Sequence, residues 1–191
     1  MPVAELLRLG IPRTIVRWGA PILHQPARPV TDFGPALQEL LGDMFATNTA
    51  AHGAGLAAQQ IGVDLAVFVY DCPDENWTPR TGVVCNPRIS LPEGSDRKLV
   101  AWEEGCLSLP GANIGLARPD TATCTGQDQY GEPITITAGG VLGRCLQHET
   151  DHINGMVFGD RLPSRRRKEL QRAADRAAEQ YPDDWPVTQS R

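Results

Sequence analysis

The chain has 191 residues, which fits one domain large enough to bury a core without disulfide staples. Its net charge of -5 argues against a protein that binds nucleic acid over its whole surface. The five cysteines include no C-x-x-C pair, which disfavours a disulfide framework or a structural zinc knuckle and favours a reducing compartment. No stretch approaches the ~20 apolar residues of a membrane span, and the N-terminus lacks the apolar core of a signal peptide. We therefore expect a soluble, cytoplasmic protein.

Before residue 138 the sequence predicts one long helix and several short strands. Residues 1–13 are predicted to be an extension, and the proline-rich residues 18–30 to be irregular. Leu37, Leu41 and Phe45 recur at helical spacing, so the first predicted helix covers 33–51, and Gly53 ends it. Apolar or alternating runs predict strands over 65–70, 82–90, 98–102, 122–125 and 133–137.

Two more helices are predicted in the remainder of the chain. The first covers about 139–154, and Gly155 closes it. The second covers about 163–181, with Ser164 as the candidate N-cap, and residues 183–191 are predicted to be frayed. We divide the chain into an N-terminal extension (1–13), a catalytic domain (14–162), and a C-terminal helix and tail of the same domain (163–191).

The order of these elements predicts the fold class. Short strands joined by glycine and proline turns, without alternating helices, favour antiparallel sheets over a doubly wound fold. We predict an α+β fold in which antiparallel β-sheets pack around the helix over 139–154, with a further C-terminal helix. The inner side of that central helix is expected to carry Val141, Leu142, Cys145, Leu146, His148, Glu149, His152 and Ile153.

The most informative motif lies on the central helix, in the H-E-x-x-H spacing of residues 148–152. On a helix, His148 and His152 lie one turn apart on one face, where both imidazoles can bind one metal ion. Glu149 projects beside them, within reach of a water on that ion. A metal, a water and a carboxylate together make a hydrolytic centre. The alternative is two polar side chains on a solvated helix face.

A third ligand is needed, because a catalytic zinc-like site usually keeps three protein ligands and a water. The position where a metzincin places its third histidine holds Phe158, which cannot ligate. The better candidate is Cys106, which sits in a glycine-flanked segment ending in Pro110 and Gly111. A thiolate is a strong ligand for a soft or borderline metal. The alternative for Cys106 is an inert buried thiol.

Three runs together resemble the signature motifs of peptide deformylases, in the same order. They are residues 53–60 (GAGLAAQQ), 104–108 (EGCLS) and 147–152 (QHETDH), and the resemblance extends from about residue 15 to 162. It implies a hydrolase that removes the formyl group, as formate, from the N-formylmethionine of new polypeptides. It further implies that Cys106, His148 and His152 hold the metal and that Glu149 is the general base and acid.

The same resemblance assigns the oxyanion donors and exposes two departures from the family pattern. Gln60 and the backbone N–H of Leu107 are implied to stabilise the tetrahedral anion. Gln59 stands where the motif commonly has proline, so the choice of Gln60 over Gln59 rests on counting from Gly55. Asn113 replaces a residue that is basic in some members, which leaves contacts to the substrate's peptide portion open.

The family builds a slot for the methionine side chain beside the metal. The resemblance implies that Ala54, Gly55, Val141 and Cys145 form this slot here. Arg144 replaces an apolar residue found in some members, so its aliphatic stem is expected to line the slot while its charge reaches solvent. The alternative is that Val141 and Cys145 are ordinary core positions.

The resemblance also bears on the metal and the partners. Two imidazoles and a thiolate alone make Zn²⁺ the default ion, whereas the resemblance implies one Fe²⁺ per chain in cells, with Zn²⁺, Ni²⁺ or Co²⁺ able to occupy the site after purification. N-formylmethionyl peptides and nascent chains are the implied substrates. Basic runs such as residues 165–168 usually form a solvated face. In some deformylases the C-terminal helix is implicated in ribosome docking, and the resemblance suggests the same alternative role here.

Three other functions remain as alternatives. Another metallopeptidase with H-E-x-x-H is disfavoured because the third ligand resembles Cys106 rather than a downstream histidine or glutamate. An inactive relative that binds formyl-peptides is disfavoured because every catalytic position is filled. A noncatalytic module with a structural metal would usually show four closed ligands.

Overall fold

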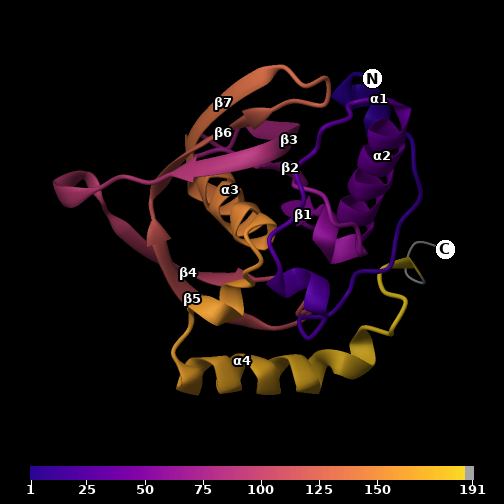
Figure 1. The fold of residues 1–191 in the computed structure, drawn as a ribbon. Coiled ribbons are helices and arrows are strands. Elements are labelled where there is room, and N and C mark those ends of the chain that lie inside the picture. The colour runs from indigo at the N-terminus through magenta and orange to yellow at the C-terminus, as the bar shows by residue number, and fades with distance from the viewer. Residues whose placement is uncertain (188–191) are drawn as a thin grey trace.

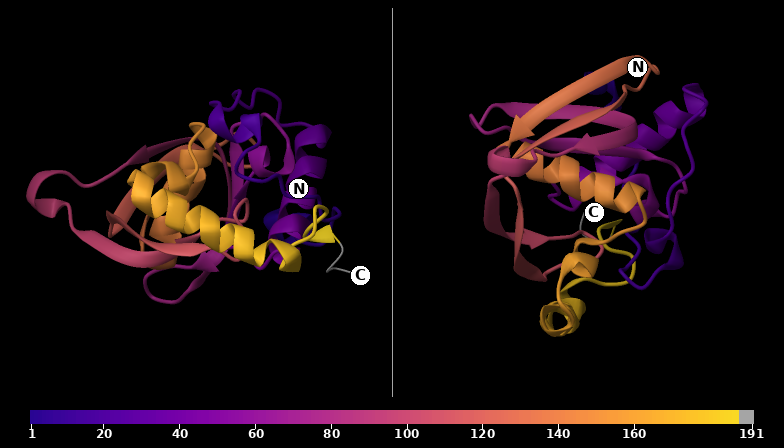
Figure 2. Two further views of the ribbon diagram at one scale, coloured as in Figure 1. Left: turned by 90° about the horizontal axis from the view of Figure 1, so that it is seen from below. Right: turned by 60° about the vertical axis from the view of Figure 1, so that its left-hand side comes forward.

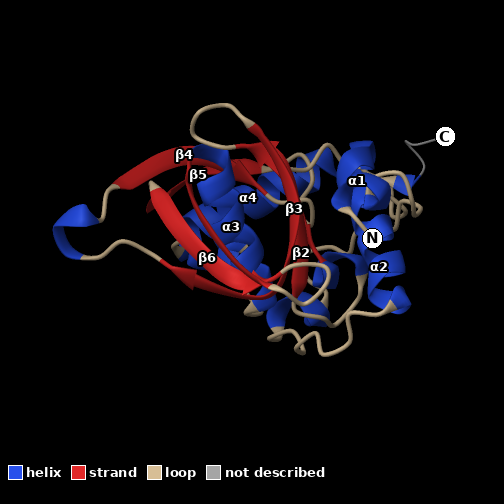
Figure 3. Cartoon of the chain, turned by 90° about the horizontal axis from the view of Figure 1, so that it is seen from above, coloured by secondary structure: helices blue, strands red, loops and turns tan. Residues whose placement is uncertain are grey.

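Two antiparallel sheets surround a central helix in the computed structural model, which describes residues 1–187 (Figure 1). The central helix is α3 (Gly140–Ile153). The larger sheet has the order β1-β2-β3-β6-β7, with β1 (Gly55–Ala57), β2 (Val67–Pro73), β3 (Pro79–Ser90), β6 (Thr121–Gln127) and β7 (Pro133–Gly139). The smaller sheet pairs β4 (Leu99–Gly105) with β5 (Asn113–Pro119). Figure 3 shows α3 enclosed between the strands of the two sheets.

The first half of strand β2, residues 67–69, is apolar because both of its faces are covered. Val67 and Val69 belong to a buried cluster with α2 (Pro35–Ala50), whereas Phe68 belongs to a second cluster with α3. Successive side chains of a strand point to opposite faces, so this alternation places α2 and α3 on opposite sides of the larger sheet. The sheet therefore supports α3 from behind, and the polar face of that helix looks toward the smaller sheet.

The C-terminal end of α3 is held by the local geometry that its glycine permits. Gly155 adopts φ +76°, its N–H donates to His152, and Met156 N–H donates to Asp151, which is a Schellman arrangement. A Cβ at Gly155 would lie 2.6 Å from the backbone carbon of Gln25. This close approach helps to end the helix at Ile153, one residue after His152.

The remaining helices lie outside the two sheets. Helix α1 (Val3–Leu6) packs on α2, where Leu6 is fully buried. Helix α4 (Ser164–Ala177) runs beside β5 at one end of the molecule, and Leu170 anchors it in a third buried cluster (Figures 1 and 2). Short 3-10 helices cover Pro21–His24, Ala58–Ile61, Gly94–Asp96, Phe158–Arg161 and Ala178–Gln180.

The α+β prediction is confirmed, and the five predicted strands and three predicted helices occur near their expected bounds. The short strand β1 and the strand β5 were not predicted. Ser164 is not the N-cap of α4: Pro163 takes that position, and no side chain caps the helix. Among the described residues, no helix is long and apolar enough to cross a membrane.

The prediction of a frayed tail is wrong for residues 183–187. Trp185 is only 4% exposed and belongs to the same buried cluster as Ile15 and Leu6. Its N–H and carbonyl both make backbone hydrogen bonds, to Pro182 and from Ile15. Residues 188–191 lie outside the described part of the chain. We call residues 178–187 the C-terminal segment.

Candidate active site

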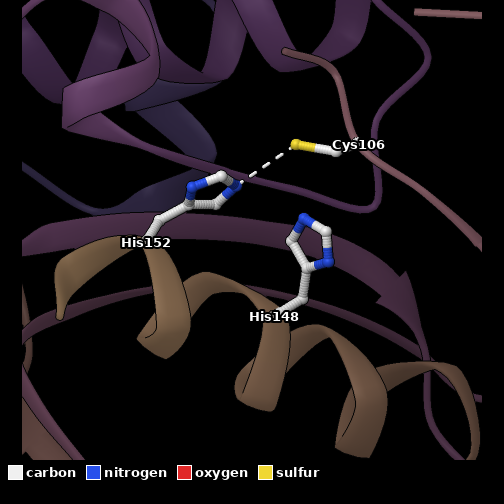
Figure 4. A group of neighbouring side chains, drawn as sticks. All are labelled: Cys106, His148 and His152. Atoms are coloured by element: carbon white, nitrogen blue, oxygen red, sulfur yellow. Dashed lines mark hydrogen bonds between the residues drawn. The ribbon is translucent and has the colours of Figure 1, made fainter. Parts of the chain in front are cut away.

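Three potential metal ligands converge beside α3. The donor atoms of Cys106, His148 and His152 all lie within 4.8 Å of one another. The two imidazoles project from α3 one turn apart, and the thiol approaches from the segment that follows β4 (Figure 4). Cys106 Sγ lies 3.3 Å from His152 Nε2. Sequence positions 46 residues apart thus meet in one site, as the motifs imply.

The residues around these ligands fit a bound divalent ion. His148 Nδ1 lies 2.8 Å from Glu104 Oε1, which leaves Nε2 directed to the cluster. A carboxylate on the outer nitrogen is the usual way in which a protein orients a metal-binding imidazole. His152 is fully buried, and its Nδ1 has no hydrogen-bond partner within residues 1–187. Two imidazoles and one thiolate suit a borderline ion such as Zn²⁺ or Fe²⁺.

A buried charge network holds Glu104 in place. Arg118, whose side chain is 3% exposed, donates to both oxygens of Glu104, at 2.7 and 2.9 Å, and to Asp151 at 2.9 Å. Arg161 binds Asp151 from the other side. Burial by itself raises the pKa of Glu104, but hydrogen bonds from Arg118 and His148 outweigh it and keep that pKa well below its usual range. Glu104 is therefore a fixed negative charge behind His148.

Glu149 has a different environment from Glu104 although both carboxylates are buried. Burial raises the pKa of Glu149 to about 7, and the carboxylates of Glu104 and Asp151 act in the same direction. Its Oε2 is buried without a hydrogen-bond partner among the described residues. A carboxyl group that titrates near neutral pH suits transfer of a proton in both directions.

The two adjacent glutamines point in different directions. Gln60 Oε1 accepts from the N–H of Ala57 at 2.9 Å, and Gln60 Nε2 lies 3.6 Å from Cys106 Sγ. Gln59 instead donates to the carbonyls of Ile22 and Gln25, away from the thiol. The tertiary structure therefore places the amide of Gln60, and not that of Gln59, beside the three converging ligands.

These groups lie around one cavity of about 560 Å³. Its volume is within the range of pockets that enclose a drug-sized ligand. All the site residues expected from the sequence line it except His152, which is buried behind the others: Ala54, Gly55, Gln60, Cys106, Leu107, Val141, Arg144, Cys145, His148 and Glu149. The structure thus brings together residues from β1, the segment after β4, and α3.

Gly55 makes room for two of its neighbours in this cavity. A Cβ at Gly55 would lie 2.7 Å from Cys145 Sγ and 2.9 Å from Glu149 Oε1. Such distances are shorter than real contacts, so a side chain here would displace one of them. The Cys145 thiol also points to the carbonyl of Ala54, at 3.5 Å. The first motif and α3 therefore pack together across the expected methionine slot.

The guanidinium of Arg144 does not reach solvent as the sequence suggested. It donates to Glu104 Oε2 at 2.7 Å and to the carbonyl of Val100 at 2.8 Å, and the side chain is only 13% exposed. It also lies over the ring of Trp102, 5.3 Å from the centroid. The buried carboxylate of Glu104 attracts the guanidinium of Arg144 inward. A sequence pattern does not reveal this contact between distant positions.

Several cavity residues were missed by the sequence analysis. Trp102 borders the cavity from β4, and Tyr181 and Trp185 border it from the C-terminal segment. No motif marks these positions. The signal that could have found the last two was a pair of aromatic residues in an otherwise polar terminus, because aromatic side chains gain much free energy when they are buried.

The fold and the cavity define a metal-dependent hydrolase, and comparisons with known proteins agree. The family model described as polypeptide deformylase matches residues 12–168. The chain is 50% identical over 173 residues to peptide deformylase 1 of Streptomyces avermitilis, covering 91% of this chain and 80% of that one. It is 49% identical over 160 residues to peptide deformylase 2 of Streptomyces coelicolor, covering 84% and 88%.

Solved structures agree in fold. The crystal structure of a peptide deformylase from Legionella pneumophila matches with a TM-score of 0.78 and 38% identity, covering 88% of this chain and 96% of that one. A peptide deformylase from Synechococcus elongatus in complex with actinonin matches with a TM-score of 0.75 and 35% identity, covering 87% and 88%.

The chain belongs to the polypeptide deformylase family. These are metal-dependent hydrolases that remove the N-formyl group from nascent peptides. The family, the fold and the activity predicted from the three motifs are therefore confirmed.

Proposed function

We propose that Cys106, His148 and His152 hold the catalytic ion and that Glu149 carries both protons of deformylation. The observation that supports this assignment is the convergence of the three donor atoms within 4.8 Å, at a cavity that Cys106, His148 and Glu149 line. The orientation of His148 by Glu104 supports it further, because that contact leaves Nε2 directed to the cluster.

The protein's own groups carry out the proton steps. A divalent ion at these ligands supplies a Lewis acid that makes water acidic and polarises the formyl carbonyl. Glu149 takes a proton from water as its oxygen adds to the formyl carbon. It then returns a proton to the amine nitrogen as the carbon–nitrogen bond breaks, which yields formate and a free N-terminus.

Gln60 and the N–H of Leu107 are the proposed donors to the anionic oxygen of the tetrahedral intermediate. The hydrogen bond from Ala57 N–H to Gln60 Oε1 fixes the amide so that Nε2 faces Cys106. Donors fixed where charge develops are typically worth about 3–4 kcal/mol each. This pre-orientation supports Gln60 as the amide donor, and Gln59 lacks it because its Nε2 is engaged by Gln25.

We propose that the methionine side chain occupies the slot formed by Ala54, Gly55, Val141 and Cys145. These residues line the same cavity as the ligands, and Gly55 contributes no side chain to fill it. The aliphatic stem of Arg144 closes this side of the cavity, and its guanidinium binds Glu104. An unbranched apolar side chain fits such a slot better than a branched one.

The ion proposed for the working enzyme is Fe²⁺, with Zn²⁺, Ni²⁺ or Co²⁺ able to bind the same donors. The support is the family resemblance together with a mixed imidazole and thiolate donor set. Elemental analysis of protein purified without oxygen tests this assignment. Zinc at full occupancy with undiminished formate release would contradict it.

Formate release is the decisive assay for the proposed function. Wild-type protein should release formate from formyl-Met-Ala peptides and leave an internally quenched peptide without a formyl group uncut. Glu149→Gln is the matched control, since it keeps the shape of the side chain and cannot accept a proton. Cleavage of the quenched peptide instead would favour another type of metallopeptidase and reject the assignment.

Two further proposals concern where the enzyme works. All five cysteines are free, which supports the cytoplasm as its compartment. The exposed Arg165, Arg166 and Lys168 of α4 are the residues that we propose dock on the ribosome. Arg167 is different because its guanidinium binds the carbonyls of Gly159 and other residues before α4.

Co-sedimentation with ribosomes tests the docking proposal. Replacing Arg165, Arg166 and Lys168 by alanine should reduce the bound fraction, while the fold keeps its Arg167 contacts. Replacing the acidic residues Glu169 and Asp175 on the same helix is the matched control. Unchanged co-sedimentation of the triple variant would remove the proposal.

A further inference from the structure

The C-terminal segment forms one wall of the active-site cavity. Tyr181 and Trp185 line it together with Cys106, His148 and Glu149. Their two rings meet edge to face, with centroids 5.2 Å apart. In Figures 1 and 2 the chain leaves α4 and turns back toward the end of α2. Residues near the C-terminus are thus part of the cavity that holds the reactive groups.

Contacts from the N-terminal part of the chain hold this wall in place. Arg17 Nη2 donates to the carbonyls of Tyr181 and Pro182, at 3.0 and 2.9 Å. The guanidinium lies 5.7 Å from the ring centroid of Trp185, and the N–H of Ile15 donates to the carbonyl of Trp185 at 3.0 Å. Two charge-assisted hydrogen bonds, a cation–π contact and a backbone hydrogen bond hold the segment in one position.

The segment also packs against the loop that carries the metal-binding thiol. Gly111 has φ +76°, and a Cβ there would lie 2.7 Å from Tyr181 Cε2 and 2.6 Å from Ala177 Cβ. Only glycine allows this approach, so the loop and the segment meet without an intervening side chain. Leu107, Leu109 and Pro110 of the loop line the same cavity as Tyr181.

This wall differs in character from the side that holds the proposed methionine slot. The slot side is built from residues 54–55 and α3, and it includes the charged side chain of Arg144. The wall is built from apolar loop residues and the two aromatic rings. In the proposed binding mode the formyl group lies at the ligands and the methionine side chain lies beside Val141 and Cys145. The residues that follow the methionine must then extend along the rest of the cavity.

We propose that Tyr181 and Trp185 bind the substrate residues that follow the formylated methionine, and that they select apolar side chains there. This inference rests on the proposed function. Aromatic rings suit the task because each buries a large area while fixing few rotatable bonds. Arg17 is a positioning residue, since it acts by holding Tyr181 and Trp185 and does not itself line the cavity.

Two substrates of different length separate this role from general damage. Tyr181→Ala should raise KM for formyl-Met-Leu-Leu about tenfold, and KM for formyl-Met amide by less than about twofold. The kcat should stay within about twofold on both substrates, because Tyr181 touches no reacting atom. Arg17→Ala should show the same KM pattern, and Arg17→Lys should restore part of it.

Matched controls are available on the surface. Tyr130 is 50% exposed and Trp77 is 78% exposed, and neither lines the cavity. Tyr130→Ala and Trp77→Ala should leave KM unchanged for both substrates. Trp185→Phe is used in place of Trp185→Ala, because Trp185 is buried and a ring at this position protects the fold.

The wild-type enzyme provides a second test that needs no variant. Its kcat/KM should be about tenfold higher for formyl-Met-Leu-Leu than for formyl-Met-Gly-Gly, because only the former places apolar side chains on the wall. Equal values for these two peptides would overturn the inference. Equal KM increases on the long and short substrates in Tyr181→Ala would also overturn it. Absence of formate release from every formylated peptide would instead contradict the proposed function.

Discussion

Helix α3 and the C-terminal segment border the same cavity, but their residues are held by different forces. The reactive side chains of α3 are fixed by a buried helix and by charged partners such as Glu104 and Arg118. The rings of the C-terminal segment are fixed by backbone carbonyls that Arg17 and Ile15 bind. In the proposed roles, side chains of α3 bind the ion and carry protons, whereas those of the segment offer apolar area.

The two regions therefore differ in how accurately their atoms must be positioned. Metal ligation and proton transfer require atoms held to within a fraction of an ångström, which packing on all sides of α3 supplies. Binding of variable peptide residues requires only a complementary apolar surface. Changes in α3 should therefore affect the chemical step or the metal, and changes in the segment should affect KM.

The largest expected effect is on α3. Glu149→Gln should lower kcat by about 10²–10⁴-fold, because one residue handles both proton transfers. Metal content should stay at the wild-type level, since Cys106, His148 and His152 remain. Formate release and elemental analysis on the same preparations measure the two quantities.

A companion variant sharpens that result. Cys106→Ser should lose the metal together with activity, because a hydroxyl is a poorer ligand than a thiolate. If Glu149→Gln lost its metal while Cys106→Ser kept both metal and activity, the ligand assignment would be wrong. If Tyr181→Ala lowered kcat as much as Glu149→Gln does, the proposed difference between α3 and the C-terminal segment would be wrong.

The second largest effect concerns the charges behind α3. Arg118→Met should lower the free energy of unfolding by about 3–5 kcal/mol, because it leaves Glu104 and Asp151 buried without their shared partner. Urea unfolding of the full-length protein measures this. Arg28→Met is the control, since its ion pair with Asp64 is largely exposed.

The double variant Arg118→Met/Glu104→Gln tests whether the loss comes from unpaired charge. It should cost less than the sum of the two single variants, because the charges then disappear together. Strict additivity would mean that Arg118 and Glu104 contribute independently. In that case the account of a coupled network behind His148 would fail.

A smaller effect is expected at the methionine slot. Cys145→Trp should raise KM for formyl-Met peptides about tenfold or more, because the ring would fill the space beside Gly55. The metal content should remain intact. A small formyl amide without the methionine side chain serves as the control, and an equal loss on that substrate would indicate general damage to the core.

The smallest expected effect on stability lies at the C-terminal segment. Arg17→Ala should lower the free energy of unfolding by about 1–2 kcal/mol, because two hydrogen bonds from a partly exposed guanidinium are lost. Thermal or urea unfolding measures it. A loss as large as that of Arg118→Met would show that the segment is as integral to the core as α3 is.

The sequence by itself predicted the family, its activity and most of the elements. The spacing of His148 and His152 is local, so helical geometry alone places their side chains on one face, with Glu149 beside them. The helices and the longer apolar strands could be predicted because periodicity reports which face of an element is apolar. Cys106 entered through the order of three motifs, and the structure brings it to His152 across 46 positions.

Only the tertiary structure decided how the remaining parts meet. It separated Gln60 from Gln59 through the partners of each amide, and it turned the charge of Arg144 inward to Glu104. It also buried Trp185 against residues more than 160 positions away, where sequence reasoning predicted a frayed end. The physical reason is that periodicity describes an element's own faces, whereas what covers a face depends on contacts between distant positions. Those contacts leave no local pattern in the chain.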